Sequence, residues 1–374
     1  METLIDTQNF IQKYQLLQCI QCGRCTGGCP MSLKTGLNVR QLVYETLVRG
    51  VDVQAREELW DCTSCTTCVT RCPKGLNPTD FIIGLRSVLV ENGRIPPSIR
   101  DALKSIFTHG NPLAIPRDER SAWAEGLEIK SASEDVDVVY FVGCTPAYDP
   151  RVQKVARAVV KVLDKAGVSF GTLGNDESCC GSQVRRVGEE GLFEMLVEDN
   201  LEVFKEYDVQ RMVTLSPHCY NVFKNEYEGL DFEVQHYTQF MAGLIEGGQL
   251  TFSGMVEKVV TYQDPCFLGK QNKIFDEPRK ILKSIPGVEF RDLDRSRERS
   301  LCCEGGGGRM WVEGTNVKDR LAQIRIEDAI ELGAEILATA CPFCLLTLED
   351  AVKVGGYEET IRVMDLIELV AQAI

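Results

Sequence analysis

The stretch that opens with Asp264-Pro265-Cys266 and closes with Cys341-Pro342-Phe343-Cys344 carries five cysteines in three motifs. Its middle motif is Cys302-Cys303-Glu304-Gly305-Gly306-Gly307-Gly308. The motifs are far apart in the chain, so only a fold can bring their thiols together. Five thiols are one more than a tetrahedral zinc site uses. We therefore interpret them as the ligands of an iron–sulfur cluster of unusual shape: Cys266, Cys302, Cys303, Cys341 and Cys344.

This stretch is the second copy of a repeated unit. Upstream, an apolar segment ends in Cys144, the pair Cys179-Cys180 follows, and Cys219 closes the copy. The offset between corresponding cysteines changes only from 122 residues, between Cys144 and Cys266, to 125 residues, between Cys219 and Cys344. Such a regular offset indicates an internal duplication.

Each copy alternates apolar strands with helices, which favours a parallel α/β sheet. In the first copy Asp149 is placed as a helix cap, Pro150 occupies the first turn, and Gly167 lies just past the helix end. Ligands of parallel sheets bind at the carboxyl ends of strands, where the cysteines of both copies fall. Helix N-termini at that edge lower the pKa of a thiol and so stabilise thiolates.

Two further cysteine runs precede the repeats. They are Cys19-x2-Cys22-x2-Cys25-x3-Cys29-Pro30 and Cys62-x2-Cys65-x2-Cys68-x3-Cys72-Pro73, which is the pattern of bacterial two-cluster ferredoxins. Three cysteines of a run wrap one cubane, and the fourth reaches the other. One [4Fe–4S] cluster is therefore assigned to Cys19, Cys22, Cys25 and Cys72. The other is assigned to Cys62, Cys65, Cys68 and Cys29. A pair of zinc knuckles, the alternative, fits two complete runs ending in Cys-Pro less well.

The segment between the two runs predicts a helix, because apolar residues recur there near helical spacing: Val39, Leu42, Val43, Leu47 and Val48. The ferredoxin module is therefore expected to be helical. After it, a short helix is predicted at Ser98–Phe107, and Trp123 is interpreted as a packing anchor. The expected domains are the ferredoxin module at 1–95, a linker at 96–135, the first repeat at 136–250 and the second repeat at 251–374.

The composition narrows the function further. The 374 residues include 41 basic and 55 acidic ones, and the net charge of −14 argues against nucleic acid or an anionic membrane as the main partner. No apolar run approaches the ~20 residues of a membrane helix, and the start of the chain lacks the features of a signal peptide. With 17 cysteines and only three histidines, thiolate–metal chemistry in a reducing, cytoplasmic location is expected.

The two copies of Cys…Cys-Cys-Gly…Cys-x-x-Cys behind a two-cluster ferredoxin resemble the heterodisulfide reductase family. The resemblance is to its D-type subunit, or to a fusion of its C and B subunits, and extends to the linker residues Gly110-Asn111-Pro112, Arg117-Asp118-Glu119-Arg120 and Trp123. It implies an α+β multidomain protein, in which an α-helical ferredoxin module precedes a duplicated α/β cysteine-rich CCG domain. It also implies a non-cubane [4Fe–4S] cluster on the five cysteines of the second copy, where a disulfide is cleaved.

Both copies depart from the family pattern. Glu304 stands where the motif has glycine, and Ser216 replaces one cysteine of the first copy. The first copy keeps Cys144, Cys179, Cys180 and Cys219. These thiols can hold a further iron–sulfur cluster, either a cubane or a modified one with Ser216 or His218 as ligand, or they hold zinc or nothing. We interpret His218 as a hydrogen-bonding neighbour of the site rather than a ligand.

Two other features of the second copy have open interpretations. Arg291, Arg295, Arg297, Arg299 and Arg309 surround the cysteine pair and the glycines. They either attract an anionic thiol, disulfide or CoA-type group, or form a solvated loop paired with Asp292, Asp294 and Glu298. The run Gly305–Gly308 is either a phosphate cradle or a tight loop that brings backbone N–H groups to cluster sulfur. We prefer the loop, because no Gly-Lys-Ser/Thr follows.

The resulting prediction is an iron–sulfur subunit of a soluble multi-subunit oxidoreductase. Electrons from a flavin- or iron–sulfur-containing partner subunit enter the two cubanes and reach the second copy, where a disulfide is reduced or thiols are oxidised. The alternative is a relay subunit with no substrate of its own. It would serve a flavin-based bifurcating, benzoyl-CoA reductase-type or glycolate/lactate oxidase-type complex, and Ser216 favours it. A zinc-stabilised scaffold is a third interpretation.

Overall fold

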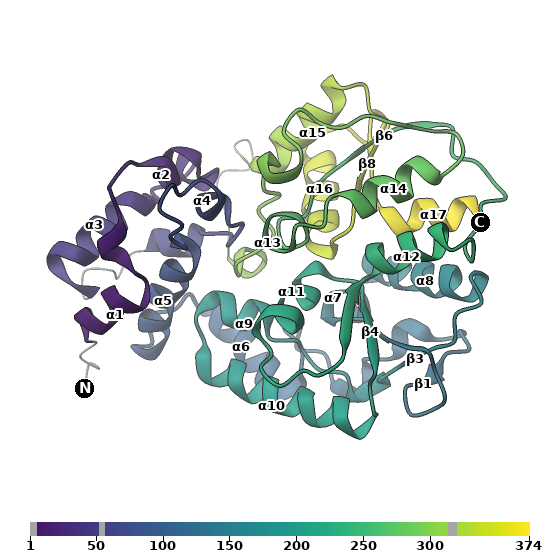
Figure 1. Ribbon diagram of the computed structural model, residues 1–374, viewed down its shortest axis with the longest axis horizontal. Helices are drawn as coiled ribbons and strands as arrows, with labels where there is room; N and C mark the ends of the chain where they lie inside the picture. The colour runs from purple at the N-terminus through teal and green to yellow at the C-terminus, as the bar shows by residue number, and fades with distance from the viewer. Residues whose placement is uncertain (1–5, 52–56, 313–319) are drawn as a thin grey trace.

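The computed structural model describes residues 6–51, 57–312 and 320–374, and it separates a helical module from two sheet-containing repeats (Figure 1). The helical module lies at one end of the molecule, and the repeats lie side by side at the other (Figure 1). Among the described residues, none of the helices has both the length and the apolar character needed to span a membrane. The expected fold class, a helical ferredoxin module followed by duplicated parallel α/β domains, is confirmed.

The helical module contains α1 (Thr7–Lys13), α2 (Arg24–Gly28), α3 (Val39–Arg49), α4 (Thr67–Thr70) and α5 (Pro78–Glu91). The predicted helix between the cysteine runs is α3, which starts after the Asn38 cap and ends at Gly50. Val39, Leu42 and Val43 are buried in it as expected. Val48, which was expected to pack with them, is instead 62% exposed.

The linker region packs onto the first repeat. Helix α6 (Pro97–His109) covers the helix predicted at Ser98–Phe107 and ends at Gly110. Trp123 is buried and meets the ring of Tyr140 edge-on at 6.1 Å, in agreement with its interpretation as an anchor. The short strand β1 (Lys130–Ser131) pairs with the edge of the first sheet.

The first repeat is a five-stranded parallel sheet with the order β1-β3-β2-β4-β5. Helix α8 begins at Pro150 and is capped by Asp149, whose side chain accepts hydrogen bonds from the amides of Arg151 and Val152. The elements of this repeat are β2 (Val138–Phe141), α7 (Cys144–Tyr148), α8 (Pro150–Lys165), β3 (Phe170–Thr172), α9 (Ser182–Val187), α10 (Glu190–Glu206), β4 (Arg211–Thr214), α11 (Pro217–Glu226), β5 (Glu233–His236) and α12 (Tyr237–Glu246).

The second repeat has a four-stranded parallel sheet with the order β7-β6-β8-β9, which matches β3-β2-β4-β5 of the first repeat. The duplication inferred from the cysteine spacing is therefore a duplication of topology. Its elements are β6 (Lys258–Tyr262), α13 (Gly269–Asn272), α14 (Asp276–Ser284), β7 (Val288–Phe290), α15 (Leu321–Glu331), β8 (Ile336–Thr339), α16 (Pro342–Gly355), β9 (Arg362–Asp365) and α17 (Leu366–Ala373).

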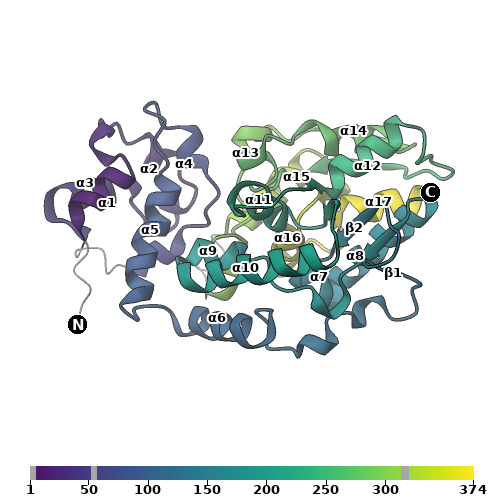
Figure 2. The ribbon, with the colours of Figure 1, turned by 60° about the horizontal axis from the view of Figure 1, so that its bottom comes forward.

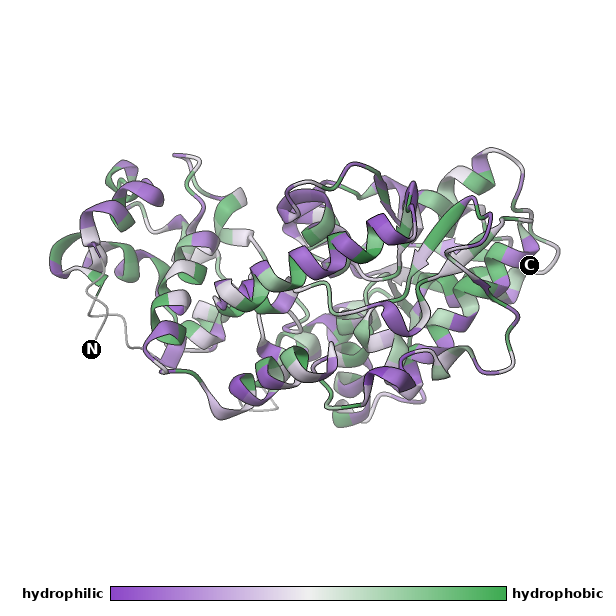
Figure 3. Ribbon diagram, turned by 90° about the horizontal axis from the view of Figure 1, so that it is seen from below, coloured by the Kyte–Doolittle hydropathy of each residue, from purple (hydrophilic) through white to green (hydrophobic). Residues whose placement is uncertain are grey.

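The two repeats share one hydrophobic core, in which α8 packs against α17 and α12 against α14 (Figure 2). Polar contacts cross the same interface. The Tyr237 hydroxyl donates to Asp365 Oδ1 at 2.5 Å, and Arg151 pairs with Glu349 and Glu368. Hydrophilic residues gather on the outer faces of the helices (Figure 3), while strands β2 and β8 are buried along their whole length. The repeats therefore form one body, with their strand ends set against each other.

Candidate functional site

The five cysteines of the second repeat converge at the carboxyl ends of its strands. Cys266 follows β6, Cys341 is the N-cap of α16, and Cys344 lies in the first turn of that helix. All five are buried, and Cys303 Sγ lies 3.1 Å from Cys344 Sγ. A hydrogen bond to Cys302 and then burial raise the pKa of Cys266 well above its ordinary value. Hydrogen bonds from Cys302 and Cys344 hold the pKa of Cys303 well below it.

The same backbone turn presents an amide to the paired cysteines of each repeat. The amide of Glu304 donates to Cys302 Sγ at 3.4 Å, and the amide of Gly181 donates to Cys179 Sγ at 3.4 Å. Both residues have positive φ angles, 72° at Glu304 and 74° at Gly181. Glycine adopts this conformation without strain, whereas glutamate does not. The side chain of Glu304 accepts a hydrogen bond from the amide of Leu321 at 2.8 Å, which offsets part of that strain.

The four cysteines of the first repeat also come together. Thiol hydrogen bonds link Cys144 to Cys179, Cys179 to Cys180, and Cys180 to Cys219. Ser216 is the N-cap of α11, and its Oγ accepts a hydrogen bond from the amide of His218 at 3.2 Å. Serine therefore serves the helix at the position where the second repeat has Cys341.

A buried arginine lies beside the first-repeat cysteines, and the sequence did not identify it as a site residue. Arg120 is 2% exposed, and both terminal nitrogens of its guanidinium lie 3.7 Å from Cys144 Sγ. It pairs with Glu177 at 2.6 Å, and Glu177 accepts hydrogen bonds from the amides of Val142 and Gly143. A hydrogen bond to Cys179 and then burial raise the pKa of Cys144, and the positive charge of Arg120 partly opposes this rise. The linker motif that contains Arg120 was the available signal.

The ferredoxin cysteines fall into a buried set and a more accessible set. The structure brings Cys29 together with Cys62, Cys65 and Cys68, and all four are buried. In the other set, Cys22 is exposed, while Cys19, Cys25 and Cys72 are half-buried. Cys25 lies close to Cys19. The set assigned to the first cubane therefore includes Cys22, the most exposed cysteine of the chain.

The buried ferredoxin set touches the second repeat. Cys302 Sγ lies 3.4 Å from the Thr63 hydroxyl, and a hydrogen bond to Cys302 is the largest of the effects that raise the pKa of Cys65. Lys270, only 3% exposed, donates to Thr67 at 3.0 Å and to the Ser300 carbonyl at 2.5 Å. A buried cation therefore lies where two cysteine sets meet, and no pattern in the sequence indicated it.

The glycine run that follows Cys303 is packed against the ferredoxin module. A Cβ on Gly306 would meet the Thr63 carbonyl at 2.8 Å, and one on Gly307 would overlap the backbone of Cys62 and Thr63. The amide of Gly305 faces Cys303, as the tight-loop interpretation expects. At Gly306 and Gly307 a side chain is excluded chiefly because the backbone of the ferredoxin module lies against them. The sequence did not reveal this reason for the glycine run.

Arg86 of α5 fixes this contact. It is fully buried and has no carboxylate among its hydrogen-bond partners in the described part of the chain. Its guanidinium donates to four backbone carbonyls at 2.7–3.0 Å, those of Leu59, Cys62, Arg186 and Gly307. One side chain therefore joins the ferredoxin module to both repeats.

The arginines near the second cysteine pair are engaged in ion pairs. Arg291 pairs with Glu289, Arg295 with Asp328, and Arg297 with Asp276. Arg309 reaches across to Asp61 of the ferredoxin module, and Arg299 donates to the carbonyl of Asp294. The paired-loop interpretation therefore holds, although the partners are not those expected from sequence proximity. An anion-attracting cluster is not what the arginines form.

His218 lies between the two repeats. Its ring is 4.1 Å from that of Phe267 and 4.7 Å from that of Phe343, and Nδ1 lies 3.1 Å from Gln183 Nε2. Burial, and then the charge of Arg186, lower its pKa to about 3. A neutral, hydrogen-bonded ring packed between aromatic side chains agrees with its interpretation as a neighbour of the site.

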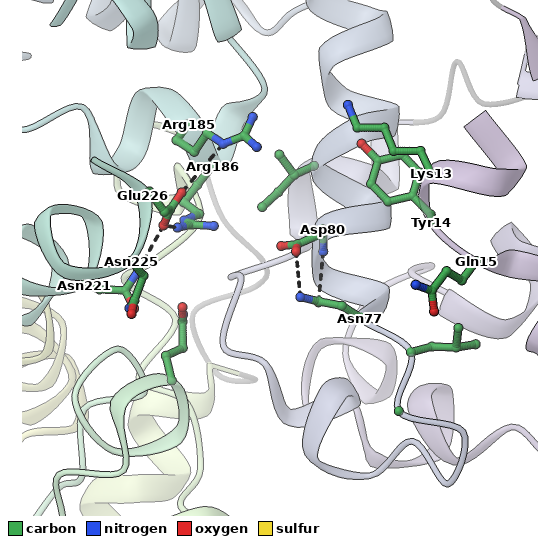
Figure 4. A pocket seen from close by; sticks show the side chains of 14 residues that line it. Lys13, Tyr14, Gln15, Asn77, Asp80, Arg185, Arg186, Asn221, Asn225 and Glu226 are labelled. Carbon is green, nitrogen blue, oxygen red and sulfur yellow. Dashed lines mark hydrogen bonds and ion pairs between the residues drawn. The ribbon is translucent and has the colours of Figure 1, made fainter. Parts of the chain in front are cut away.

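Two cavities flank these sites. One, of about 210 Å³, is lined by the first-repeat cysteines and also by Met310, Trp311, Phe343 and Leu346. Among the described residues, no lysine or arginine lines it, and its one histidine is His218. The other, of about 570 Å³, is a polar cleft between the ferredoxin module and the first repeat (Figure 4). There Asn77 and Asp80 face Arg186 and Glu226 across the opening, and none of the described residues that line the cleft is a cysteine.

The residues present fit iron–sulfur clusters. The 17 cysteines far outnumber the three histidines, they gather in sets of four or five, and most are buried, which suits a metal that prefers soft thiolate ligands. Buried cations, Arg120 and Lys270, lie next to two of the sets, where added negative charge is otherwise costly.

Comparison with known proteins gives matches over the same regions. A family model described as a cysteine-rich domain, CCG, matches residues 138–224 and 260–349, and one described as a 4Fe-4S dicluster domain matches residues 15–76. By fold alone, the chain is similar to the crystal structure of a hypothetical protein from Helicobacter pylori. The TM-score is 0.57 at 14% identity, and the match covers 98% of this chain and 71% of that one.

Three relatives differ in how much of their length the chain spans. The probable iron-sulfur-binding oxidoreductase FadF of Bacillus subtilis is 38% identical over 86% of this chain and 47% of its own. The EtfAB:quinone oxidoreductase of Syntrophomonas wolfei is 32% identical over 95% of this chain and 58% of its own. The chain thus spans about half of these two relatives. The D subunit of the dihydromethanophenazine:CoB–CoM heterodisulfide reductase of Methanosarcina mazei is 33% identical over 99% of this chain and 97% of its own.

Proposed function

The chain belongs to the family of heterodisulfide reductase D subunits, and from that premise we propose that it is the electron-carrying, substrate-reducing iron–sulfur subunit of a multi-subunit oxidoreductase. Electrons enter at the ferredoxin module and leave at the five-cysteine site of the second repeat. There a small-molecule disulfide takes up two electrons and two protons and gives two thiols, or the reverse reaction oxidises thiols.

The observation that carries this proposal is the contact between Cys302 and the Cys62–Cys68 segment. Cys302 Sγ lies 3.4 Å from Thr63 Oγ1, and the neighbouring Cys302 thiol raises the pKa of Cys65. Arg86, Lys270 and the glycine run hold the two sites together from different directions. A site meant only to stabilise its own repeat has no need of this contact.

The cofactors proposed are two cubane [4Fe–4S] clusters and one non-cubane cluster. Clusters of this kind store and release single electrons. Cys19, Cys22, Cys25 and Cys72 would hold the first cubane, and Cys62, Cys65, Cys68 and Cys29 the second. The five cysteines of the second repeat would hold the non-cubane cluster. In the first repeat, four thiols beside Arg120 are suited to a further cluster.

A second candidate is an electron relay without a substrate. Ser216 acts as a helix cap, so the first repeat has four thiols where the second has five. One relative is named an EtfAB:quinone oxidoreductase, and a relay subunit would take the same place between a flavoprotein and another acceptor. The intact second site favours the first candidate.

The deciding experiment is anaerobic iron analysis with EPR of protein oxidised in the presence of a series of thiols. Three four-iron clusters predict about 12 iron atoms per chain, and a filled first repeat about 16. A paramagnetic signal that depends on the thiol supports disulfide chemistry at the second repeat. Ferredoxin-type signals that no thiol changes would support the relay instead.

A further inference from the structure

Positive charge is concentrated in the two segments that carry the ferredoxin cysteines. Residues 7–44 and 62–79 contain six basic side chains and no acidic one, while the whole chain has a net charge of −14. Five of the six are exposed to solvent, and four of these contact or lie close in sequence to the accessible cysteines, namely Arg24, Arg40, Arg71 and Lys74. We name these four residues the cationic face.

The cationic face is assembled by contacts as well as by sequence. A Cβ on Gly23 would lie 3.6 Å from Arg40 Cδ, and one on Gly28 would overlap the side chain of Arg71. Both arginines therefore lie over the loop that runs from Cys22 to Cys29. Arg71 and Lys74 also flank Cys72, and Arg24 lies next to Cys25. The four charges thus surround the accessible cysteine set.

The charges of this face are not neutralised by neighbouring carboxylates. Among the described residues, no carboxylate pairs with Arg24, Arg40, Arg71 or Lys74. The acidic side chains nearest in sequence are otherwise engaged: Glu45 is 6% exposed and accepts from Gln41, Asp61 pairs with Arg309, and Asp80 accepts from Asn77. Four such unneutralised positive charges on an acidic protein can attract the negatively charged surface of another protein.

Apolar side chains complete the surface. Leu17 and Ile20, on either side of Cys19, are 80% and 61% exposed, and Cys22 is exposed between Ile20 and Arg24. The buried ferredoxin set, by contrast, faces the second repeat. An apolar centre with a charged rim is the usual composition of a protein interface. The accessible cysteine set is thus the end of the module that another protein can reach.

We propose that the cationic face is the docking surface for an electron-carrying protein whose own docking face is acidic. The proposal rests on the proposed function, since it names the partner that supplies electrons to the module. Complementary charge steers such a partner and raises the association rate, and added salt screens the attraction over about 10 Å at 0.1 M. Each encounter transfers one electron from the reduced partner, which leaves oxidised by one electron.

The test uses reduced flavodoxin, a strongly acidic flavoprotein, as the probe for the full-length holoprotein. Its hydroquinone donates one electron and becomes the semiquinone, and stopped-flow absorbance follows reduction of the iron–sulfur protein. The variant is Arg40→Glu/Lys74→Glu. The matched control is Lys154→Glu/Lys165→Glu, which reverses two exposed charges on α8 of the first repeat. Iron content and photoreduction by deazaflavin verify that each protein carries the same clusters.

The expected result is a second-order rate constant at low ionic strength that falls about tenfold or more in the face variant and less than about twofold in the control. The dependence on salt should flatten in the face variant alone. Equal rates and equal salt dependence in variant and wild type would overturn the proposal. So would sedimentation showing that the face instead joins two copies of this chain, with the charge reversal producing monomers.

This result is separable from a failure of the proposed function. Disulfide turnover with deazaflavin-photoreduced protein does not use the cationic face, so it should be unchanged in Arg40→Glu/Lys74→Glu. If no disulfide is turned over by any variant, the proposed substrate chemistry is wrong whatever flavodoxin shows.

Discussion

The two repeats have the same backbone and different neighbours. In both, an amide from a positive-φ residue meets the paired cysteines at 3.4 Å, at Gly181 in one and Glu304 in the other. The second-repeat cysteines touch the ferredoxin module, while the first-repeat cysteines open on a cavity of about 210 Å³. Duplication therefore preserved the turn that holds the thiols. The surroundings differ, and they place only one copy against the buried ferredoxin set.

The difference extends to how charge is balanced. The first-repeat thiols have Arg120 at 3.7 Å, held by Glu177. The second repeat has a buried pair of the same kind, Arg279 with Asp264 at 2.7 Å, two residues before Cys266. It also has Lys270, which lies toward the ferredoxin segment and donates a hydrogen bond to Thr67. The cation that contacts the ferredoxin segment is therefore an addition of the second repeat.

The strongest test removes the equivalent cysteine from each repeat. Cys302→Ala should lower disulfide turnover by about a hundredfold or more, because it removes both a proposed ligand and the contact with Thr63. Cys179→Ala should leave most of the turnover. Turnover assays with EPR of the ferredoxin signals measure both effects. Similar losses in the two variants would show that both repeats take part in the chemistry.

A second test breaks the connection rather than the site. Arg86→Met should leave the buried carbonyls of Leu59, Cys62, Arg186 and Gly307 without their donor, at a cost of several kcal/mol. We expect turnover to fall about tenfold as the ferredoxin module loosens. Arg120→Met, the control, removes a buried linker arginine that contacts Cys144 and Glu177 of the first repeat. If it slows turnover as much as Arg86→Met, the first repeat lies on the electron path.

A third test uses the interface between the repeats. Burial raises the pKa of Asp365 to about 8, against the opposing hydrogen bond from Tyr237. A carboxyl with a raised native pKa stabilises the fold least at high pH, so stability is lost as pH rises from about 4 through 8. Asp365→Asn keeps the hydrogen-bond acceptor for Tyr237 and removes that loss. The variant should gain a few kcal/mol relative to wild type between about pH 5 and 9.

Melting curves at several pH values would measure this change. In the first repeat, the residue that corresponds to Asp365 is His236, the N-cap of α12. Burial lowers the pKa of His236 to about 3. Both caps are thus neutral near pH 6. A stability difference between Asp365→Asn and wild type that does not vary with pH would mean that Asp365 is charged in the folded protein.

The sequence was sufficient for features that depend on spacing and local chemistry. The cysteine runs, the duplication and the capped helix at Asp149 are all local patterns that any fold must respect. The sequence did not predict Arg86 or Lys270 as buried contacts, because their partners are backbone carbonyls and hydroxyls more than twenty residues away. The carboxylate partners of Arg295 and Arg297 were also missed, since they lie 33 and 21 residues away.

The smallest expected effect concerns the turn that both repeats share. Gly181→Ala places a Cβ 2.8 Å from Phe193 at a φ of 74°, so it should lower the melting midpoint by a few degrees. Glu304→Gly relieves strain but loses the hydrogen bond to the Leu321 amide, so its net effect should be smaller. Comparing the melting midpoints of the two variants shows whether Glu304 contributes to stability or only avoids lowering it. A loss in Glu304→Gly as large as that in Gly181→Ala would mean that the glutamate contributes stability that glycine cannot, and that the second repeat departed from the family pattern for a structural reason.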